Sequence, residues 1–230
     1  MAASSAVATG AGLKCALFDG LTPRDRDAIL AASTTRRFPA NSVITKQGYA
    51  ADRLLLLVKG SVRNFYTTSE GKKILLFWMS PGEAFGGLAL ASKPFPYMVS
   101  AEAVRDCEVL VWERSTFRAF VAKFPVLLDN AILLAATYVD HCVAAQVALS
   151  CHSARERLGS TLREFAVATG EKMRDGILVD VTNEELANSA HITKFTTSRI
   201  LAEWQKSRLL TKRRGKILVP SLDRLPIGQR

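Results

Sequence analysis

Residues 182–207 read Thr-Asn-Glu-Glu-Leu-Ala-Asn-Ser-Ala-His-Ile-Thr-Lys-Phe-Thr-Thr-Ser-Arg-Ile-Leu-Ala-Glu-Trp-Gln-Lys-Ser, and they carry the strongest structural signal in the chain. The first four have the form of a capping box, in which Thr182 and Glu185 each accept a backbone amide at the start of a helix. A turn at residues 191–193 follows, and Thr193 is placed to cap a second helix. The pattern therefore predicts two short helices joined by a three-residue turn, a helix-turn-helix.

Basic residues concentrate in and after the second predicted helix. Residues 191–216 hold eight lysines and arginines against one acidic residue, a net charge of +7 in a chain whose formal net charge is +10. The eight are Lys194, Arg199, Lys206, Arg208, Lys212, Arg213, Arg214 and Lys216. One interpretation is a solvated charged face; the other is a surface that binds a polyanion such as nucleic acid.

The order of these features favours nucleic acid. The second helix of such a motif enters the major groove with its first turns against base edges, where an arginine can contact a guanine. Residues 209–219 predict a β-hairpin wing with a basic tip at Arg214-Gly215. We expect Lys194, Thr197 and Ser198 to point outward, and Phe195 to point outward or pack inward. The predicted DNA-contacting residues are Thr182, Asn183, Thr193, Lys194, Phe195, Thr196, Thr197, Ser198, Arg199, Lys212, Arg213, Arg214, Gly215 and Lys216.

A different pattern occupies residues 17–120. Short apolar runs at 53–59, 61–66 and 73–79 are separated by glycines at intervals of eleven or twelve residues. Short strands at that spacing, with turn residues between them, are typical of an all-β sandwich, roll or barrel.

Residues 125–150 predict one long helix. Apolar residues recur on it at 3-4 spacing, and much of the remaining surface is apolar too. A helix with two apolar faces fits one side on its own β-domain and the other on a second copy. The alternative is a helix buried entirely within its own chain. The predicted dimer interface is Leu127, Ala131, Leu134, Tyr138, Cys142 and Ala145.

The third part of the chain begins with another capping box, Ser153-Ala-Arg-Glu156, which opens a helix to about Val167. A loop at 169–176 and a short strand at 177–181 follow. The prediction is thus an α+β fold with a β-domain at 15–122, a long helix at 123–150 and a C-terminal domain at 153–230.

Nothing in the sequence indicates an enzyme, a metal site or a membrane protein. The four cysteines, Cys15, Cys107, Cys142 and Cys151, lack the close spacing of zinc or iron–sulfur ligands, so we interpret them as free thiols in a reducing cytoplasm. Three scattered histidines and the lack of a phosphate-binding loop argue against catalysis. The first dozen residues do not form a signal peptide, and the most apolar stretch, 131–139, ends at a charged residue.

With these residues in view, the chain resembles the CRP/FNR family of bacterial regulators over nearly its whole length. The resemblance is carried by residues 58–63 and 71–76, by 81–90, and by 181–187, 196–201 and 215–219. It implies a cyclic-nucleotide-binding-like jelly roll (a β-roll), a long dimerisation helix and a C-terminal winged helix. It also implies a homodimeric transcription regulator that binds palindromic sites in double-stranded DNA, with RNA polymerase as a candidate partner.

The resemblance places an effector pocket at Phe85, Gly86, Gly87, Leu88, Tyr97 and Met98. Family members that bind cyclic AMP carry a glutamate and an arginine where this chain has Gly87 and Tyr97. A buried phosphate without an arginine would be an uncompensated charge, so we do not expect cyclic AMP. An apolar ligand pocket and a collapsed core without ligand both stay open.

Three further signals come into question for the β-domain: haem, a redox change and another nucleotide. Haem bound through His141 is not expected, since a lone helical histidine is more often structural. Redox sensing at Cys142, and another nucleotide whose phosphates contact Lys93 or Arg105, are the alternatives. Two departures from the family concern DNA binding. Phe195 replaces a glutamate, and His191 replaces a turn glycine; if the turn needs a positive φ at that position, histidine is tolerated at some cost. The sequence leaves open the effector, the half-site, the target genes and the sign of regulation.

Overall fold

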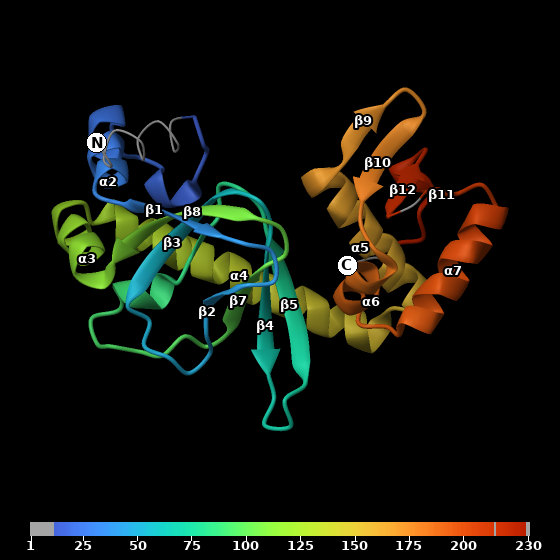
Figure 1. Cartoon of the computed structure of the whole chain (residues 1–230), viewed down its shortest axis with the longest axis horizontal. Coiled ribbons are helices and arrows are strands. Elements are labelled where there is room, and N and C mark those ends of the chain that lie inside the picture. Colours follow the sequence, from blue (N-terminus) through green and yellow to red (C-terminus); the bar gives the residue numbers. More distant parts are fainter. Residues whose placement is uncertain (1–11, 214, 229–230) are drawn as a thin grey trace. The chain divides into compact units, whose positions relative to one another are not determined.

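The computed structural model of the chain describes residues 12–213 and 215–228, so the predicted contact residue Arg214 lies outside the described residues. The chain divides into two compact units, 1–140 and 141–230. The division falls within the long helix α4 (Val126–Cys151), in the region where the sequence predicts a helix between two domains. Figure 1 shows the elements of each unit in chain order.

The first unit is built on two four-stranded antiparallel sheets, with strand orders β1-β8-β3-β6 and β2-β7-β4-β5. Their strands are β1 (Thr34–Phe38), β2 (Val43–Thr45), β3 (Arg53–Lys59), β4 (Val62–Thr67), β5 (Lys73–Met79), β6 (Ala84–Phe85), β7 (Ser100–Ala103) and β8 (Cys107–Glu113). This arrangement confirms the predicted jelly-roll-like β-domain.

Strand β3 shows why the run of leucines in the sequence folds this way. Leu55 and Leu57 belong to the apolar cluster between the two sheets. Leu54 and Leu56 belong to a second cluster, which also contains Trp112 and Phe117. Because successive side chains of a strand point to opposite faces, an unbroken apolar run fits a strand that is covered on both sides.

Helices cover the outer side of this sheet, and the strand-like prediction for residues 17–120 missed two of them. They are α2 (Pro23–Ala31) and α3 (Arg114–Lys123), beside the short 3-10 turns η1 (Ala16–Phe18) and η2 (Gly87–Leu90). The start of α2 did carry a signal, because Thr22 caps it and Pro23 occupies its first position. Helix α3 is held by Phe117, whose ring packs edge-on against that of Trp112, with the ring centroids 5.6 Å apart.

The face of α4 that was predicted to form the dimer interface packs against the β-roll of the same chain. Leu127 has no exposed surface and lies in the outer cluster, and Ala131 and Leu134 pack against that cluster. Tyr138 donates a hydrogen bond from its hydroxyl to the Ala84 carbonyl (2.8 Å). The prediction of Leu127 at a dimer interface is therefore wrong, and the other three residues are half-buried against the roll.

A different face of α4 is exposed in the described chain. Leu128, Ile132 and Val139 are 43%, 60% and 62% exposed, and the same spacing continues to Val143 and Val147. We call these five residues the outer stripe. Of the other predicted interface residues, Cys142 is exposed and Ala145 is half-buried. By length and composition alone α4 could cross a membrane, but its inner face is occupied by the roll.

The second unit packs three helices on a four-stranded sheet of order β11-β12-β10-β9. Its elements are α5 (Ala154–Thr169), β9 (Glu171–Met173), β10 (Gly176–Asp180), α6 (Asn183–Ser189), α7 (Lys194–Lys206), β11 (Thr211–Arg213), β12 (Lys216–Val219) and the 3-10 turn η3 (Leu222–Arg224). Strand β9 lies inside the stretch predicted as a loop. This strand forms because the backbone of residues 171–173 pairs with β10. Its side chains are all exposed, so they show no alternating apolar pattern from which a strand could be predicted.

We expect Leu127→Ala to lower the free energy of unfolding of the first unit by about 2–5 kcal/mol, because the substitution leaves a cavity in a core that cannot fully collapse. Urea denaturation followed by near-ultraviolet circular dichroism measures the change. Leu133→Ala on the same helix is the control, since Leu133 is 68% exposed. Equal losses in the two variants would contradict the assignment of Leu127 to the core.

Candidate nucleic-acid interface

Both helices of the predicted helix-turn-helix begin at the capping residues expected from the sequence. Glu185 accepts the backbone amide of Thr182 (2.7 Å), and Thr182 accepts that of Glu185 (3.1 Å). The hydroxyl of Thr193 accepts the amide of Thr196 at 3.0 Å. These bonds satisfy amides that the first turn of a helix leaves without partners, and so they set where α6 and α7 start.

The turn between the two helices depends on His191, whose φ is +50°. The turn therefore does need a positive φ at the position where the family usually has glycine, and histidine adopts it here. Ile192 donates its amide to the Ala187 carbonyl at 3.0 Å, which closes the turn. From α5, the guanidinium of Arg157 donates to the carbonyls of Ala190 (3.1 Å) and His152 (2.7 Å). The turn is thus held from outside as well as by its own backbone.

Helix α7 has one face in the core and one in solvent. Ile200, Leu201 and Trp204 are buried in the cluster shared with α5 and α6. Phe195 is 79% exposed, so of the two orientations left open by the sequence it takes the outward one. Thr197 is fully buried, and its hydroxyl donates to the carbonyl of Thr193 (3.1 Å). The prediction that Thr197 points outward is wrong, because its position falls on the side of the helix that carries Ile200 and Leu201.

Polar contacts hold the outward side chains at the start of α7. Lys194 forms an ion pair with Glu184 of α6 at 2.8 Å. The amide of Asn183 donates to the hydroxyl of Ser198 (2.9 Å), which links the two helices of the motif. These two contacts bring the start of α6 and the start of α7 together at the surface of the second unit.

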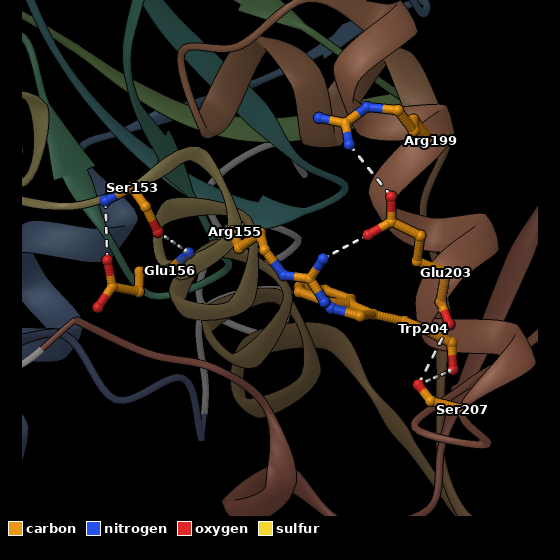
Figure 2. Close-up of polar contacts among 7 residues, drawn as sticks. All are labelled: Ser153, Arg155, Glu156, Arg199, Glu203, Trp204 and Ser207. Carbon is orange, nitrogen blue, oxygen red and sulfur yellow. Dashed lines mark hydrogen bonds and ion pairs between the residues drawn. The ribbon is translucent and has the colours of Figure 1, made fainter.

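Arg199 is held by a carboxylate that sequence reasoning did not single out. Glu203 accepts from Arg199 one turn earlier on α7 (3.1 Å) and pairs at the same time with Arg155 of α5. Figure 2 shows the Glu203 carboxylate between the two guanidinium groups. Exposed ion pairs of this kind contribute about 0.2–1 kcal/mol, so a base edge or phosphate can replace Glu203 as the partner of Arg199.

The predicted wing is present as the hairpin of β11 and β12. Arg213 and Lys216, which pair across it, are exposed, and Lys212 is half-buried. Gly215 in the turn has a φ of +68°, a backbone conformation that glycine adopts without strain. The inner side is anchored by Ile217 and Val219, both buried in the core of the unit. The basic side chains are thus carried on a short, anchored hairpin.

The residues predicted for the effector pocket differ in burial and in backbone role. Phe85 is buried between the sheets, and Met98 is 62% exposed. Gly86 has a φ of +77°, and a Cβ there would lie 2.5 Å from the Arg53 carbonyl oxygen, so the chain requires glycine at this place. Gly87 and Leu88 form the first half of η2, while Tyr97 is buried.

Two aromatic residues lie close to this segment: Phe77, which sequence reasoning did not single out, and Tyr138, which it assigned to the dimer interface. The ring of Tyr138 from α4 stacks on Phe77 of β5, with centroids 4.9 Å apart and planes at 20°. Its hydroxyl bonds to Ala84, two residues before Gly86. The signal was the phenol itself, since a tyrosine in an apolar stripe needs a hydrogen-bond partner when it is buried. The stacking on β5 and the hydrogen bond next to the predicted pocket segment thus join α4 to the roll.

The histidines and cysteines show no gathered site among the described residues. No group of three or more His, Cys, Asp or Glu side chains in that part of the chain is placed to hold a metal ion. Cys142 and Cys151 are exposed free thiols, whereas Cys15 and Cys107 are buried. Burial raises the pKa of Cys15 to about 11, which keeps that thiol protonated. His141 is exposed on α4.

The titration of His191 generates a pH prediction. Burial lowers the pKa of this imidazole, and the positive charge of Arg157 acts in the same direction. Below about pH 6.5, where an unfolded histidine binds a proton, the folded chain binds it less readily, so the free energy of unfolding falls as the pH falls. Thermal unfolding between pH 8 and 5 should show this loss.

The matched variant is His191→Asn, because asparagine tolerates a left-handed backbone and does not titrate in this range. We expect its stability to decline less steeply in acid than that of the wild type. The same pH dependence in both proteins would show that His191 does not contribute.

Comparison with known proteins agrees with this geometry. Residues 35–124 match the model of the cyclic nucleotide-binding domain, and residues 156–226 match that of the Crp-like helix-turn-helix domain. A relative in Thermus thermophilus, a cyclic AMP receptor protein, is 30% identical over 187 residues, which are 80% of this chain and 83% of the relative. The anaerobic regulatory protein of Bacillus subtilis is 26% identical over 196 residues, 84% of this chain and 82% of its own.

Solved structures show the same fold at lower identity. FixK2 from Bradyrhizobium japonicum aligns with a TM-score of 0.75 at 20% identity, covering 86% of this chain and 98% of its own. The regulator CLP of Xanthomonas campestris aligns with a TM-score of 0.76 at 18% identity, covering 87% and 100%. The two matched domains and the likeness over four fifths of the length lead to one conclusion: the chain belongs to the CRP/FNR family of transcription regulators, with a DNA-binding helix-turn-helix.

Proposed function

We propose that this protein is a homodimer that binds a specific palindromic DNA site in the cytoplasm and regulates transcription under the control of its first unit. The observation that carries the proposal is the exposed face of α7. It presents Lys194, Phe195, Ser198 and Arg199 to solvent while Trp204 and its neighbours anchor the opposite face in the core. A rigid cationic helix of this kind fits the major groove.

Each part of the surface has a distinct proposed role. Arg199 donates to a guanine edge once it leaves Glu203, and Phe195 contacts a thymine methyl group. The wing residues Lys212, Arg213 and Lys216 meet phosphates, which position the protein without reading the sequence. Further proposed contacts are Thr182, Asn183, Thr193, Lys194, Thr196, Ser198 and Gly215.

The outer stripe of α4 supports the homodimer. Apolar side chains repeated along one helix face suit a parallel pairing with the same face of a second copy, because a two-fold axis brings identical patches together. Such a dimer carries two recognition helices, which match two half-sites about 34 Å apart, one turn of DNA. The pairing would also cover part of the exposed apolar surface of α4, the helix that is long and apolar enough to cross a membrane.

Control by the first unit is supported by the contact of α4 with the segment around Ala84. A change there alters the position of Tyr138, and with it the helix that carries the outer stripe. We do not propose cyclic AMP as the signal, since Gly87 and Tyr97 offer neither a carboxylate nor a guanidinium to that ligand. RNA polymerase is the proposed partner through which bound dimers act on transcription.

We expect Arg199→Ala to relax base preference at one position of each half-site by about 1–3 kcal/mol, because a bidentate guanine contact is lost. Lys212→Ala should instead weaken all duplexes to a similar degree and reduce the salt dependence, because it removes a phosphate contact. Selection of bound duplexes from a random pool, followed by titration of the selected and scrambled duplexes, measures both effects. A wild-type selection without an enriched motif would sink sequence-specific recognition.

The dimer has its own test. Val139→Asp places a charge within the outer stripe and should shift the protein from dimer to monomer in sedimentation, with loss of affinity for a palindrome. Thr137→Asp is the matched control, since it adds the same charge two residues away on an exposed position outside the stripe. If both variants stay dimeric, the outer stripe is not the interface.

A further inference from the structure

A cavity of about 350 Å³ opens in the first unit beside the edge strands β1 and β2 of the two sheets. Of the residues predicted for the effector pocket, Tyr97 lines it and the other five do not. The cavity is therefore distinct from the place where the resemblance puts the ligand of the family. Its volume lies within the range of about 300–1,000 Å³ that is usual for small-molecule sites.

The floor of the cavity is apolar. Leu55 and Val111 come from the cluster between the two sheets, and the ring of Tyr97 is 92% buried beside them. The hydroxyl of Tyr97 donates to the Arg53 carbonyl (3.0 Å) and accepts the Arg53 amide (3.3 Å). Because that hydroxyl is already paired, Tyr97 offers its ring to an occupant.

The rim carries cations that lack acidic partners. On β1, Arg36 lies opposite Val109, whose side chain is in the cluster between the sheets, so Arg36 shares the inner face. Its neighbour Arg37 lies on the outer face and pairs with Glu108 at 3.5 Å. Within the described part of the chain, no carboxylate pairs with Arg36.

Lys46 and Arg53 complete the rim. Lys46 lies 4.8 Å over the ring of Tyr49 and has no carboxylate partner among the described residues. Arg53 is paired with Glu113 at 3.2 Å, and the acidic residue of the rim, Asp52, is 3.9 Å from Arg53. Two positive charges thus remain uncompensated beside an apolar floor.

We propose that this cavity binds a small organic anion, a carboxylate or phosphate monoester carried on an apolar body about the size of one aromatic ring. Arg36 and Lys46 bind the anionic group, because a guanidinium offers paired donors to carboxylate and phosphate oxygens. Tyr49, Tyr97 and Leu55 contact the body. Binding here is independent of DNA; only its part in regulation rests on the proposed function.

A methyl-labelled sample of the full chain allows a direct test. Phenyl phosphate and benzoate are titrated as the organic anions, with inorganic phosphate as the anion alone and phenol as the ring alone. We expect both organic anions, or one of them, to shift the methyl resonances of Ile44, Leu55 and Val111 and to bind at least tenfold tighter than inorganic phosphate and phenol. The phosphate and carboxylate arms show which anionic group the site prefers. Methyl groups remote from the cavity, such as those of Ile200, should not move.

Two variants test which basic side chains bind the anion. The double variant Arg36→Ala with Lys46→Ala should lose at least tenfold in affinity, whereas Arg37→Ala, on the same strand and the opposite face, should bind as the wild type does. An inward charge on an edge strand can also serve only to prevent pairing between sheets. In that case neither organic anion shifts these methyl groups, and the proposal is overturned. Equal binding of phenol, or an equal loss in Arg37→Ala, overturns it too.

The same preparations are titrated with the selected duplex. If the wild type binds DNA specifically but neither organic anion, the cavity proposal alone fails. If an organic anion binds at the cavity while no duplex is selected, the proposed function fails and the binding site stands.

Discussion

Burial of Ile200, Leu201 and Trp204 is the constraint on which the DNA-binding surface depends. These side chains fasten one face of α7 to α5 and α6, and the opposite face must then point to solvent. Since an α-helix is rigid, that one contact orients every outward residue from Lys194 to Arg199 together. The caps, the left-handed turn and the wing set the ends of the elements, but none of them would place a base-reading side chain without this packing.

The ion pairs on the exposed face of α7 are weak, so DNA binding breaks no strong interaction there. Lys194 and Arg199 are paired with Glu184 and Glu203 in exposed positions, where each pair contributes little. Glu203 also connects Arg199 to Arg155 of α5, so the residue proposed to read a guanine is supported from a second helix of the same unit.

Helix α4 links the proposed control by the first unit to the proposed dimer interface, because both of its faces are apolar. The inner face carries Leu127 and the Tyr138 contact to the roll, and the outer stripe is free for a second copy. Any ligand that changes the roll acts on a helix that is part of the proposed dimer interface. The cavity rimmed by Arg36 and Lys46 lies in the same unit. Leu55 and Val111 of its floor belong to the cluster between the sheets, Phe77 packs against that cluster, and Phe77 stacks on Tyr138 of α4.

Local patterns alone determined much of this protein. The capping boxes, the turn between α6 and α7, the wing and the strand-rich character of the first domain were predicted from residues close together in the sequence, because short-range hydrogen bonds and side-chain periodicity set them. The jelly-roll form of that domain was implied by the family resemblance and not by local patterns. Only the tertiary structure decided which stripe of α4 faces the roll, since both stripes are apolar. Tertiary packing also placed Arg155 of α5 beside Glu203 and brought Arg36 and Lys46 to one cavity. Those outcomes depend on contacts between residues far apart in the chain, which no local pattern encodes.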